Sequence, residues 1–258
     1  MKKQLSAKTN TSTLLFDMAV KFKNRLFEFL MVFLAVFMGF WADRWRERLF
    51  EKEREKQFMI AMYQDLKSDI NDFTLNIAKS NNVVFSMNRV ISLLNSSSKY
   101  DSAISIYHYA RSITLNAPFY QPNQRTYEQM KYSGELRLIG EDAVSDSITG
   151  YYSSLVWILT QNQYIHERIG DYMAGAEFIF DGNVFLSILE KKPDSELMKI
   201  MPKEKYLTKD KLLFNKLFIR TQYFSGACGV TIKGANDALL KCRNLIALLQ
   251  RKYQIKPS

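Results

Sequence analysis

The stretch 26–42 (LFEFLMVFLAVFMGFWA) constrains this chain most, because every residue in it except Glu28 is apolar. At about 1.5 Å per residue it forms a helix of roughly 25 Å, slightly shorter than the ~30 Å hydrocarbon core of a bilayer. A helix that is apolar on all sides is typical of a membrane span. The alternatives are a buried core helix and a cleaved signal peptide, but Phe40 stands before Ala42 where a cleavage site needs a small residue. We therefore predict a transmembrane helix over 26–42.

The acidic residue of this stretch lies in its first turn. A carboxylate at the bilayer centre would cost several kcal/mol, whereas one near the end of the helix reaches the headgroup region. Glu28 is therefore either a snorkelling residue or a contact to a cation of another protein, inside the membrane or at its interface.

The charges on the two sides of the span bear on its orientation. Six basic residues precede the span and six follow it, so a count of basic residues assigns no direction. The leading segment contains one acid, Asp17, whereas five acids follow the span, and this difference favours a cytoplasmic N-terminus with the bulk of the chain outside the cytoplasm.

The same patterns predict four regions. Residues 1–25 form a basic leader, which either lies in the membrane interface as an amphipathic helix or extends the anchor helix into water. The transmembrane helix follows over 26–42. Residues 43–57 are mostly charged and predict a solvated stalk, and residues 58–258 predict a helical bundle domain.

Apolar residues recur at steps of three, four or seven after the span, which indicates amphipathic helices. The predicted helices are 43–96, 101–114, 126–134, 142–180, 184–190 and 208–256. We expect Asp101, Thr126 and Thr208 to cap three of them, Thr126 together with Gln129 in a capping box. Three or four long antiparallel helices with short accessory helices predict an all-α fold, a bundle on a charged stalk.

Small residues interrupt the last predicted helix at 225–229 (SGACG). Gly226 and Gly229 either allow another helix to pack closely or kink their own helix, and we expect close packing. Cys228 and Cys242 lie in the same predicted helix, roughly 21 Å apart, so they cannot bond to each other within it.

The sequence carries no pattern for reaction chemistry. Its two histidines, His108 and His166, stand in no metal-ligand spacing, since Gly170 occupies the place of the second histidine of an HExxH pattern. Phosphate-binding glycine loops, nucleophile elbows and paired-cysteine motifs are also missing from the sequence. We therefore predict no catalytic residue, metal or cofactor, and a protein that is not an enzyme. The net charge of +10 is spread along the chain, which favours anionic lipid headgroups over nucleic acid.

Three stretches resemble a family of single-pass membrane proteins of Gram-negative bacteria that is defined only as a domain of unknown function. Glu28 and the run 43–47 (DRWRE) are similar to the family's span borders, and 57–70 (QFMIAMYQDLKSDI) resembles its stalk helix. The stretch 125–152 (RTYEQMKYSGELRLIGEDAVSDSITGYY) is similar to the family's Thr-Tyr-x-x-Leu-x-x-Ser-Gly-x-Leu-x-Leu-Ile segment and later Tyr-Tyr pair, with Met130 in place of leucine. The resemblance implies a bacterial inner-membrane protein with a periplasmic helical domain, and it supplies no activity.

Tyrosines in the central third of the chain, together with a Ser-Gly pair, form a candidate surface for a partner or ligand. Its residues are Tyr127, Ser133, Gly134, Tyr151 and Tyr152. We predict a membrane-anchored, non-enzymatic helical scaffold or interaction module of the cell envelope, which contacts membrane lipid and acts as a homo-oligomer or with an envelope protein partner. The alternative is a periplasmic ligand-sensing bundle that signals through a partner protein, with a pocket near the tyrosines.

Overall fold

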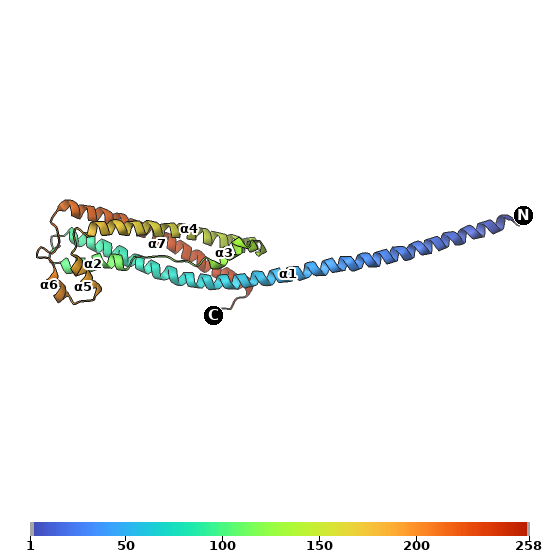
Figure 1. Ribbon diagram of the computed structural model, residues 1–258, viewed down its shortest axis with the longest axis horizontal. Helices are drawn as coiled ribbons and strands as arrows, with labels where there is room; N and C mark the ends of the chain where they lie inside the picture. Colours follow the sequence, from blue (N-terminus) through green and yellow to red (C-terminus); the bar gives the residue numbers. More distant parts are fainter. Residues whose placement is uncertain (1–2, 257–258) are drawn as a thin grey trace. The chain divides into compact units, whose positions relative to one another are not determined.

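The computed structural model describes residues 3–256, with side chains for Phe16, Met18, 21–23 and 25–256. Within this range the chain forms helices and no strands, which confirms the all-α prediction (Figure 1). The elements are α1 (Lys3–Leu94), α2 (Ala103–Leu115), α3 (Arg125–Tyr132), the short 3₁₀ helix η1 (Glu135–Leu138), α4 (Asp142–Ala176), α5 (Gly182–Leu189), α6 (Asp194–Ile200) and α7 (Lys211–Tyr253). The predicted span, the stalk and the first helix of the predicted bundle all belong to α1.

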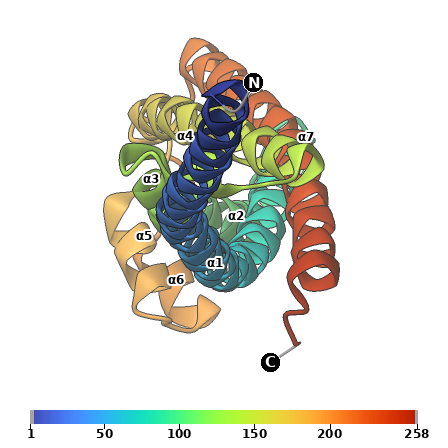
Figure 2. The same ribbon diagram turned by 90° about the vertical axis from the view of Figure 1, so that its right-hand side faces the viewer.

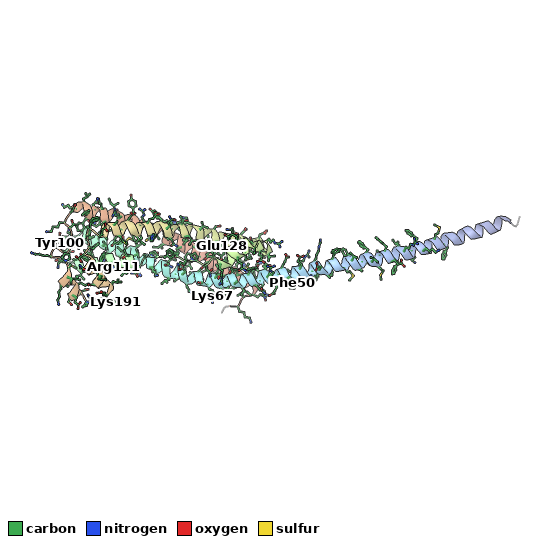
Figure 3. All side chains as sticks on the ribbon, in the orientation of Figure 1. Phe50, Lys67, Tyr100, Arg111, Glu128 and Lys191 are labelled. Carbon is green, nitrogen blue, oxygen red and sulfur yellow. The ribbon has the colours of Figure 1, made fainter. Side chains whose placement is uncertain are left out.

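The chain divides into two units, residues 1–56 and 57–258. The described part of unit 1 is the first part of α1, and every side chain from 25 to 50 is exposed. Figure 3 shows these side chains standing out around the helix as far as Phe50. By length and composition this helix is a candidate to cross a membrane, and its most apolar 18-residue window has no buried residue. The stretch 26–42 is therefore not a buried core helix of the described chain.

Three long helices build unit 2, namely residues 57–94 of α1, α4 and α7 (Figures 1 and 2). α4 and α7 run side by side in opposite directions. Gly175 near the end of α4 packs on Leu217 near the start of α7, while Glu141 before α4 pairs with Lys252 near the end of α7. Such antiparallel packing buries an apolar stripe of each helix against its neighbours.

The core of unit 2 consists of two clusters of buried apolar side chains. One cluster joins α2, α5 and α6 to the long helices around Tyr107, Phe180 and Phe224. The other gathers near α3 and includes Phe73 and Tyr151. Unit 2 thus has an extensive hydrophobic core of its own.

All three predicted helix caps are wrong, and two of them concern α2 and α7. α2 begins at Ala103, two residues after Asp101, and no side chain caps it. α7 begins after Asp210, whose carboxylate accepts the N–H of Leu212 at 2.8 Å. The Thr208 hydroxyl instead accepts the N–H of Asp210 at 3.0 Å, so it prepares the cap rather than forming it.

The close packing expected at Gly226 and Gly229 is not found among the residues that the structure describes. α7 continues through both residues, both are exposed, and no atom lies within 4 Å of a Cβ built on either. The tight contact lies at Gly234, where the Trp157 ring of α4 occupies the space that a Cβ would need.

Candidate functional site

In unit 2 a row of polar side chains, most of them buried, lies on one face of α1. Asp65, Asp69, Asp72 and Asn76 follow one another at steps of four, three and four residues, which places them on one side of the helix. We call these four residues the acidic ladder. Asp65 and Asp69 are only 2% and 1% exposed. Carboxylates are almost never buried to this extent unless they are paired, so a partner must lie against this face.

The partner is the extended segment 117–124 between α2 and α3. Pro118 and Pro122 exclude regular helix there, which leaves the N–H groups of the segment without helical acceptors. Every second N–H donates to the ladder: Phe119 to Asn76 at 3.0 Å, Gln121 to Asp72 at 2.9 Å and Asn123 to Asp69 at 2.6 Å. The ladder thus replaces the neighbouring strand that an extended segment would otherwise need.

The intervening residue Tyr120 faces the other way. Its N–H donates to Asn162 of α4 at 3.1 Å, and the Asn162 amide donates to the Tyr120 carbonyl at 2.7 Å. The Tyr120 hydroxyl also lies 3.1 Å from that of Ser80 on α1. The segment is therefore held from both sides, by α1 and by α4.

Asp65 accepts more hydrogen bonds than any other member of the ladder. Its carboxylate accepts from the N–H and the hydroxyl of Thr126, from the Asn123 amide at 2.8 Å and from the Arg125 guanidinium at 3.1 Å. The capping box predicted at Thr126 is therefore wrong. α3 begins at Arg125, and the Thr126 hydroxyl points to a buried carboxylate, which is a stronger acceptor than a neutral group.

The tyrosines predicted as a partner or ligand surface lie beside the ladder. Tyr151 is fully buried and its hydroxyl donates to Asp69 at 2.6 Å. Tyr152 is also buried, and its ring stacks on half-buried Tyr127 with centroids 4.1 Å apart. The Tyr152 hydroxyl has no hydrogen-bond partner among the described residues. Tyr151 and Tyr152 are core residues here and offer no open surface to a ligand.

Ser133 and Gly134 stop α3. Ser133 is the residue that ends the helix, and its hydroxyl donates to the Gln129 carbonyl at 2.8 Å. Gly134 has a left-handed backbone with φ of 72°, which a residue with a Cβ adopts only at a cost. These two residues therefore have a folding role in this structure.

Burial dominates the electrostatics of the ladder. It raises the pKa of Asp69 to about 6, against the opposing effect of the hydrogen bonds from Asn123 and Tyr151. Burial also raises the pKa of Asp72. The pKa of the Tyr151 hydroxyl is raised as well, first by burial and then by nearby Cys242 and Asp69, so the group stays protonated and remains a donor.

The remaining reactive residue types are accounted for by packing. His108 binds Asp194 at 2.8 Å and so links α2 to α6. Cys228 and Cys242 are buried free thiols, and burial raises the pKa of each to about 12, which keeps them in the unreactive thiol form. Within the described residues no three histidine, cysteine or acidic side chains gather to hold a metal ion.

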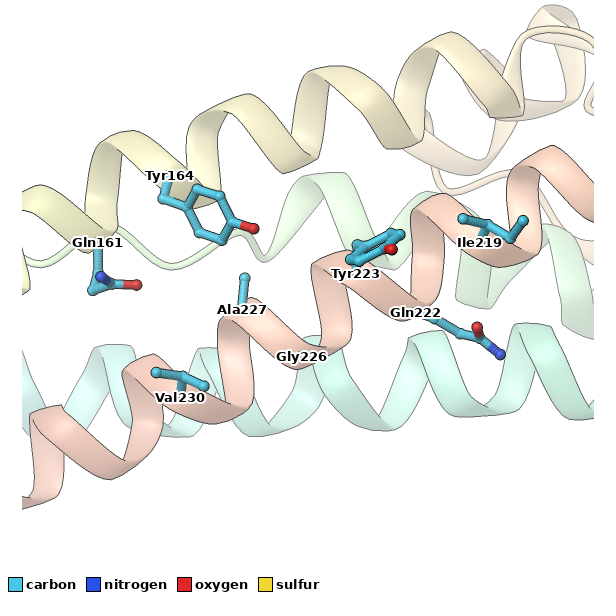
Figure 4. Close-up of a pocket in the computed structure, with 8 residues that line it drawn as sticks. All are labelled: Gln161, Tyr164, Ile219, Gln222, Tyr223, Gly226, Ala227 and Val230. Carbon is cyan, nitrogen blue, oxygen red and sulfur yellow. The ribbon is translucent and has the colours of Figure 1, made fainter.

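A groove lies on the outer surface of unit 2, between α4 and α7 (Figure 4). It has a volume of about 640 Å³ and is lined by Gln161, Tyr164, Ile219, Gln222, Tyr223, Gly226, Ala227 and Val230. Figure 4 shows Tyr164 reaching from α4 towards α7. A second hollow of about 320 Å³ shares Val230 and continues to Trp157, Lys233 and Asp237. Of the residues predicted as sites, only Gly226 lines this groove, and Gly229 lies on α7 beside it.

Glu28 is exposed on α1 of unit 1, within the apolar stretch. The structure contains no partner that would decide between its two expected roles. Sequence reasoning missed the acidic ladder, because three acids and an amide at helical spacing are also the pattern of a solvated helix face.

Two of the stretches that carry the family resemblance meet at the ladder. Asp65 and Asp69 lie in 57–70, and they bind Thr126 and Tyr151 of the stretch 125–152. Comparisons of the chain with protein-family models, curated proteins and solved structures find no match. The family resemblance therefore stays a prediction from the sequence.

Proposed function

We propose that this protein is a membrane-anchored, non-enzymatic helical scaffold or interaction module of the bacterial cell envelope. The observation that carries the proposal is the apolar stretch 26–42, whose side chains are all exposed within the chain. Aqueous exposure of such a stretch is unfavourable at about 25 cal/mol per Å² of apolar surface, so lipid is its natural surrounding. Membrane lipid is accordingly its first partner.

Two features of unit 2 support an interaction role. The acidic ladder accepts hydrogen bonds from segment 117–124 and from the start of α3, so its role is structural. The groove between α4 and α7 presents exposed apolar side chains, among them Tyr223 at 64% and Val230 at 57%. Apolar surface beside a groove is the usual mark of a protein contact.

We further propose an inner-membrane location with a cytoplasmic N-terminus and unit 2 in the periplasm, because acids are nearly absent before the span and frequent after it. The test is labelling of intact cells with a membrane-impermeant thiol reagent. Ser97→Cys, in an exposed turn, is placed in a background with Cys228→Ala and Cys242→Ala, and should be labelled. Lys21→Cys in the same background is the matched control and should be protected until lysis. The reverse pattern would contradict the orientation.

Chemical cross-linking in native membranes tests the interaction role. The expected result is a homo-oligomer or an adduct with one other envelope protein. Recovery of only monomeric chain, under conditions that cross-link a known membrane complex, would contradict the proposal.

A second candidate function is ligand sensing by unit 2, with a signal passed to a partner protein. A cavity of about 400 Å³ favours it, lined by the apolar rings of Tyr172, Phe180 and Phe185 together with Arg111. The Arg111 Nε is buried without a hydrogen-bond partner among the described residues. An apolar cavity lined by a guanidinium with one unpaired N–H suits an amphipathic carboxylate such as a fatty acid.

Thermal unfolding with and without a medium-chain fatty acid tests this second function. Binding would raise the melting temperature in a concentration-dependent way, and Arg111→Gln would reduce the shift. An unchanged melting temperature across carboxylates of several chain lengths would remove the candidate.

A further inference from the structure

The exposed face of α7 has a regular pattern. Nine exposed residues follow alternating steps of four and three: Leu212, Lys216, Ile219, Tyr223, Gly226, Val230, Lys233, Asp237 and Leu240. We call these nine residues the α7 seam. This spacing keeps them on one side of the helix, as in the contact face of a helix pair. The opposite face of α7 is already used, since it packs into the core through residues such as Leu217 and Phe224. α7 therefore has one apolar face for the bundle and a second one without a partner among residues 3–256.

The seam is nearly symmetric about Gly226. Leu212 and Leu240 each lie 14 residues from it, and Lys216 and Asp237 lie 10 and 11 residues away on opposite sides. At about 1.5 Å per residue these offsets are roughly 21 Å for the leucines and 15 to 17 Å for the charged pair. An antiparallel second copy, related by a two-fold axis at Gly226, would bring leucine opposite leucine and lysine opposite aspartate.

Charge decides between the two directions of pairing. Neither Lys216 nor Asp237 has an ion-pair partner within residues 3–256, and 21 residues separate them, so they cannot pair with each other inside one chain. A parallel pair would place Lys216 against Lys216 and Asp237 against Asp237, which is unfavourable. The antiparallel pair converts both repulsions into attractions, and the stem of Lys233 would cover Ile219 of the second copy.

Gly226 suits the crossing point of such a pair. It is exposed, and no atom lies within 4 Å of a Cβ built on it, so its backbone is open to a second helix. The groove of about 640 Å³ runs beside it between α4 and α7 and would accept side chains of the second copy such as Tyr223. Close approach at a glycine increases van der Waals contact along the rest of the helix pair.

We propose that a second copy of this chain docks on the α7 seam, antiparallel, with the two-fold axis at Gly226. The proposal deepens the proposed interaction role, on which it rests, by naming the partner and its geometry. A different envelope protein on the seam would be another class of partner, and the experiments separate it from a second copy.

Position-specific cross-linking tests the geometry on the full chain in detergent, where two copies can meet in either direction. Lys216→Cys and Asp237→Cys are introduced separately, on chains of different tag length, in the background with Cys228→Ala and Cys242→Ala. Mixing should yield the mixed cross-link between the two chains, and either chain alone should yield little. Same-position cross-links in place of the mixed one would overturn the antiparallel arrangement.

Charge exchange tests the same contact without cysteines. Lys216→Asp and Asp237→Lys should each weaken dimerisation by at least about tenfold, since each places like charges opposite each other twice per dimer. The double variant K216D/D237K should restore the dimer, and only pairing between chains can explain this recovery. Failure of the double variant to recover would overturn the proposed pair.

Gly226→Leu should abolish the dimer by separating the helices, although the open space around it leaves the fold unaffected. Gly170→Leu on α4, also exposed with open space around it, is the matched control and should dimerise normally. A dimer that tolerates all seam variants would overturn this inference and leave the proposed function standing. A seam that cross-links only to another protein would also overturn it. A chain without partners of any kind in native membranes would instead overturn the proposed function.

Discussion

Two parts of α1 differ in which kinds of side chain they expose and which they bury. In unit 1, residues 26–42 expose a continuous apolar surface, whereas in unit 2 the same helix buries Asp65, Asp69, Asn76 and Ser80. A typical amphipathic helix of a soluble protein instead buries its apolar side chains and exposes its charged ones. The contrast teaches that the partners within reach of a side chain decide its burial, more than its own hydrophobicity does.

The buried acids of unit 2 and the exposed apolar stretch of unit 1 have different physical explanations. The carboxylates of unit 2 are compensated by N–H and O–H donors of residues 119–126, because prolines leave that segment without other acceptors. The apolar stretch of unit 1 has no equivalent partner among the described residues. About a dozen large apolar side chains, each worth about 1.5–3 kcal/mol on leaving water, exceed the ~5–15 kcal/mol stability of an ordinary domain. The lipid surrounding proposed above would remove this cost.

The largest effect is expected from adding charge to the apolar stretch. Leu34→Arg together with Phe37→Arg should cost roughly 5–7 kcal/mol of membrane insertion, at about 2.5–3.5 kcal/mol per central arginine. Carbonate extraction of membranes should then release the double variant into the soluble fraction. Leu34→Ile with Phe37→Leu is the matched control and should stay in the membrane pellet, as should Glu28→Gln if that residue only reaches the headgroups. Retention of the double-arginine variant would contradict the anchor.

Loss of Asp65, which accepts the most hydrogen bonds in the ladder, is expected to have the next largest effect. Asp65→Ala leaves the buried donors of Thr126 and the Asn123 amide unpaired, which should reduce the free energy of unfolding by about 3–5 kcal/mol. Thermal or denaturant unfolding of the full chain in detergent measures this loss. Asp101→Ala, an exposed acid outside the ladder, should change stability by less than about 0.5 kcal/mol. Equal effects of both variants would show that the ladder contributes no stability.

The two parts of α1 also differ in how far they could be predicted. Apolar content and spacing predicted the long helices and an apolar helix that is a candidate membrane span, because these signals are local to each helix. The ladder could not be predicted as buried, since acids at helical spacing indicate a solvated face until the segment that covers them is known. That segment is 54 residues away for the pair of Asn123 with Asp69.

The site residues show the same limit. Thr126 has the local signature of a cap, yet its hydroxyl donates to the carboxylate of Asp65, which is 61 residues away in the sequence. Tyr151 and Tyr152 are predicted from the sequence as a partner or ligand surface, whereas long-range packing buries both of them beside the ladder. Gly226 and Gly229 were expected to pack closely, whereas the contact formed at Gly234 because Trp157 of α4 lies opposite that residue.

The stability of the protein should depend on pH, because a buried acid costs free energy when it ionises. The pKa of Asp69 is about 6 in the folded chain and 3.8 without the fold, so the folded state holds a proton between these values that the unfolded state has lost. Its contribution to stability is therefore constant below about pH 4, declines as the pH rises from about 4 to about 6, and is constant again above that. The difference corresponds to about 3 kcal/mol, at 1.36 kcal/mol per pKa unit.

Comparison of the wild-type chain with Asp69→Asn isolates this contribution, since Asp72 and the other acids remain in both. The wild-type melting temperature should rise relative to that of the variant as the pH falls from about 6 to about 4. A wild-type chain that loses stability relative to the variant over this range would show that the hydrogen bonds from Asn123 and Tyr151 outweigh burial.

The smallest effect is expected from two neighbouring hydroxyls that differ only in their partners. Tyr151→Phe removes a donor to Asp69, which should cost about 1–2 kcal/mol of unfolding free energy, because the carboxylate loses a hydrogen bond in a buried place. Tyr152→Phe removes a buried hydroxyl that has no partner among the described residues, so stability should stay unchanged or rise by up to about 1 kcal/mol. Denaturant midpoints of the two variants measured side by side give the comparison. If Tyr152→Phe loses more unfolding free energy than Tyr151→Phe, the Tyr152 hydroxyl must have a hydrogen-bond partner in solution. An acid of the ladder would then be the nearest acceptor.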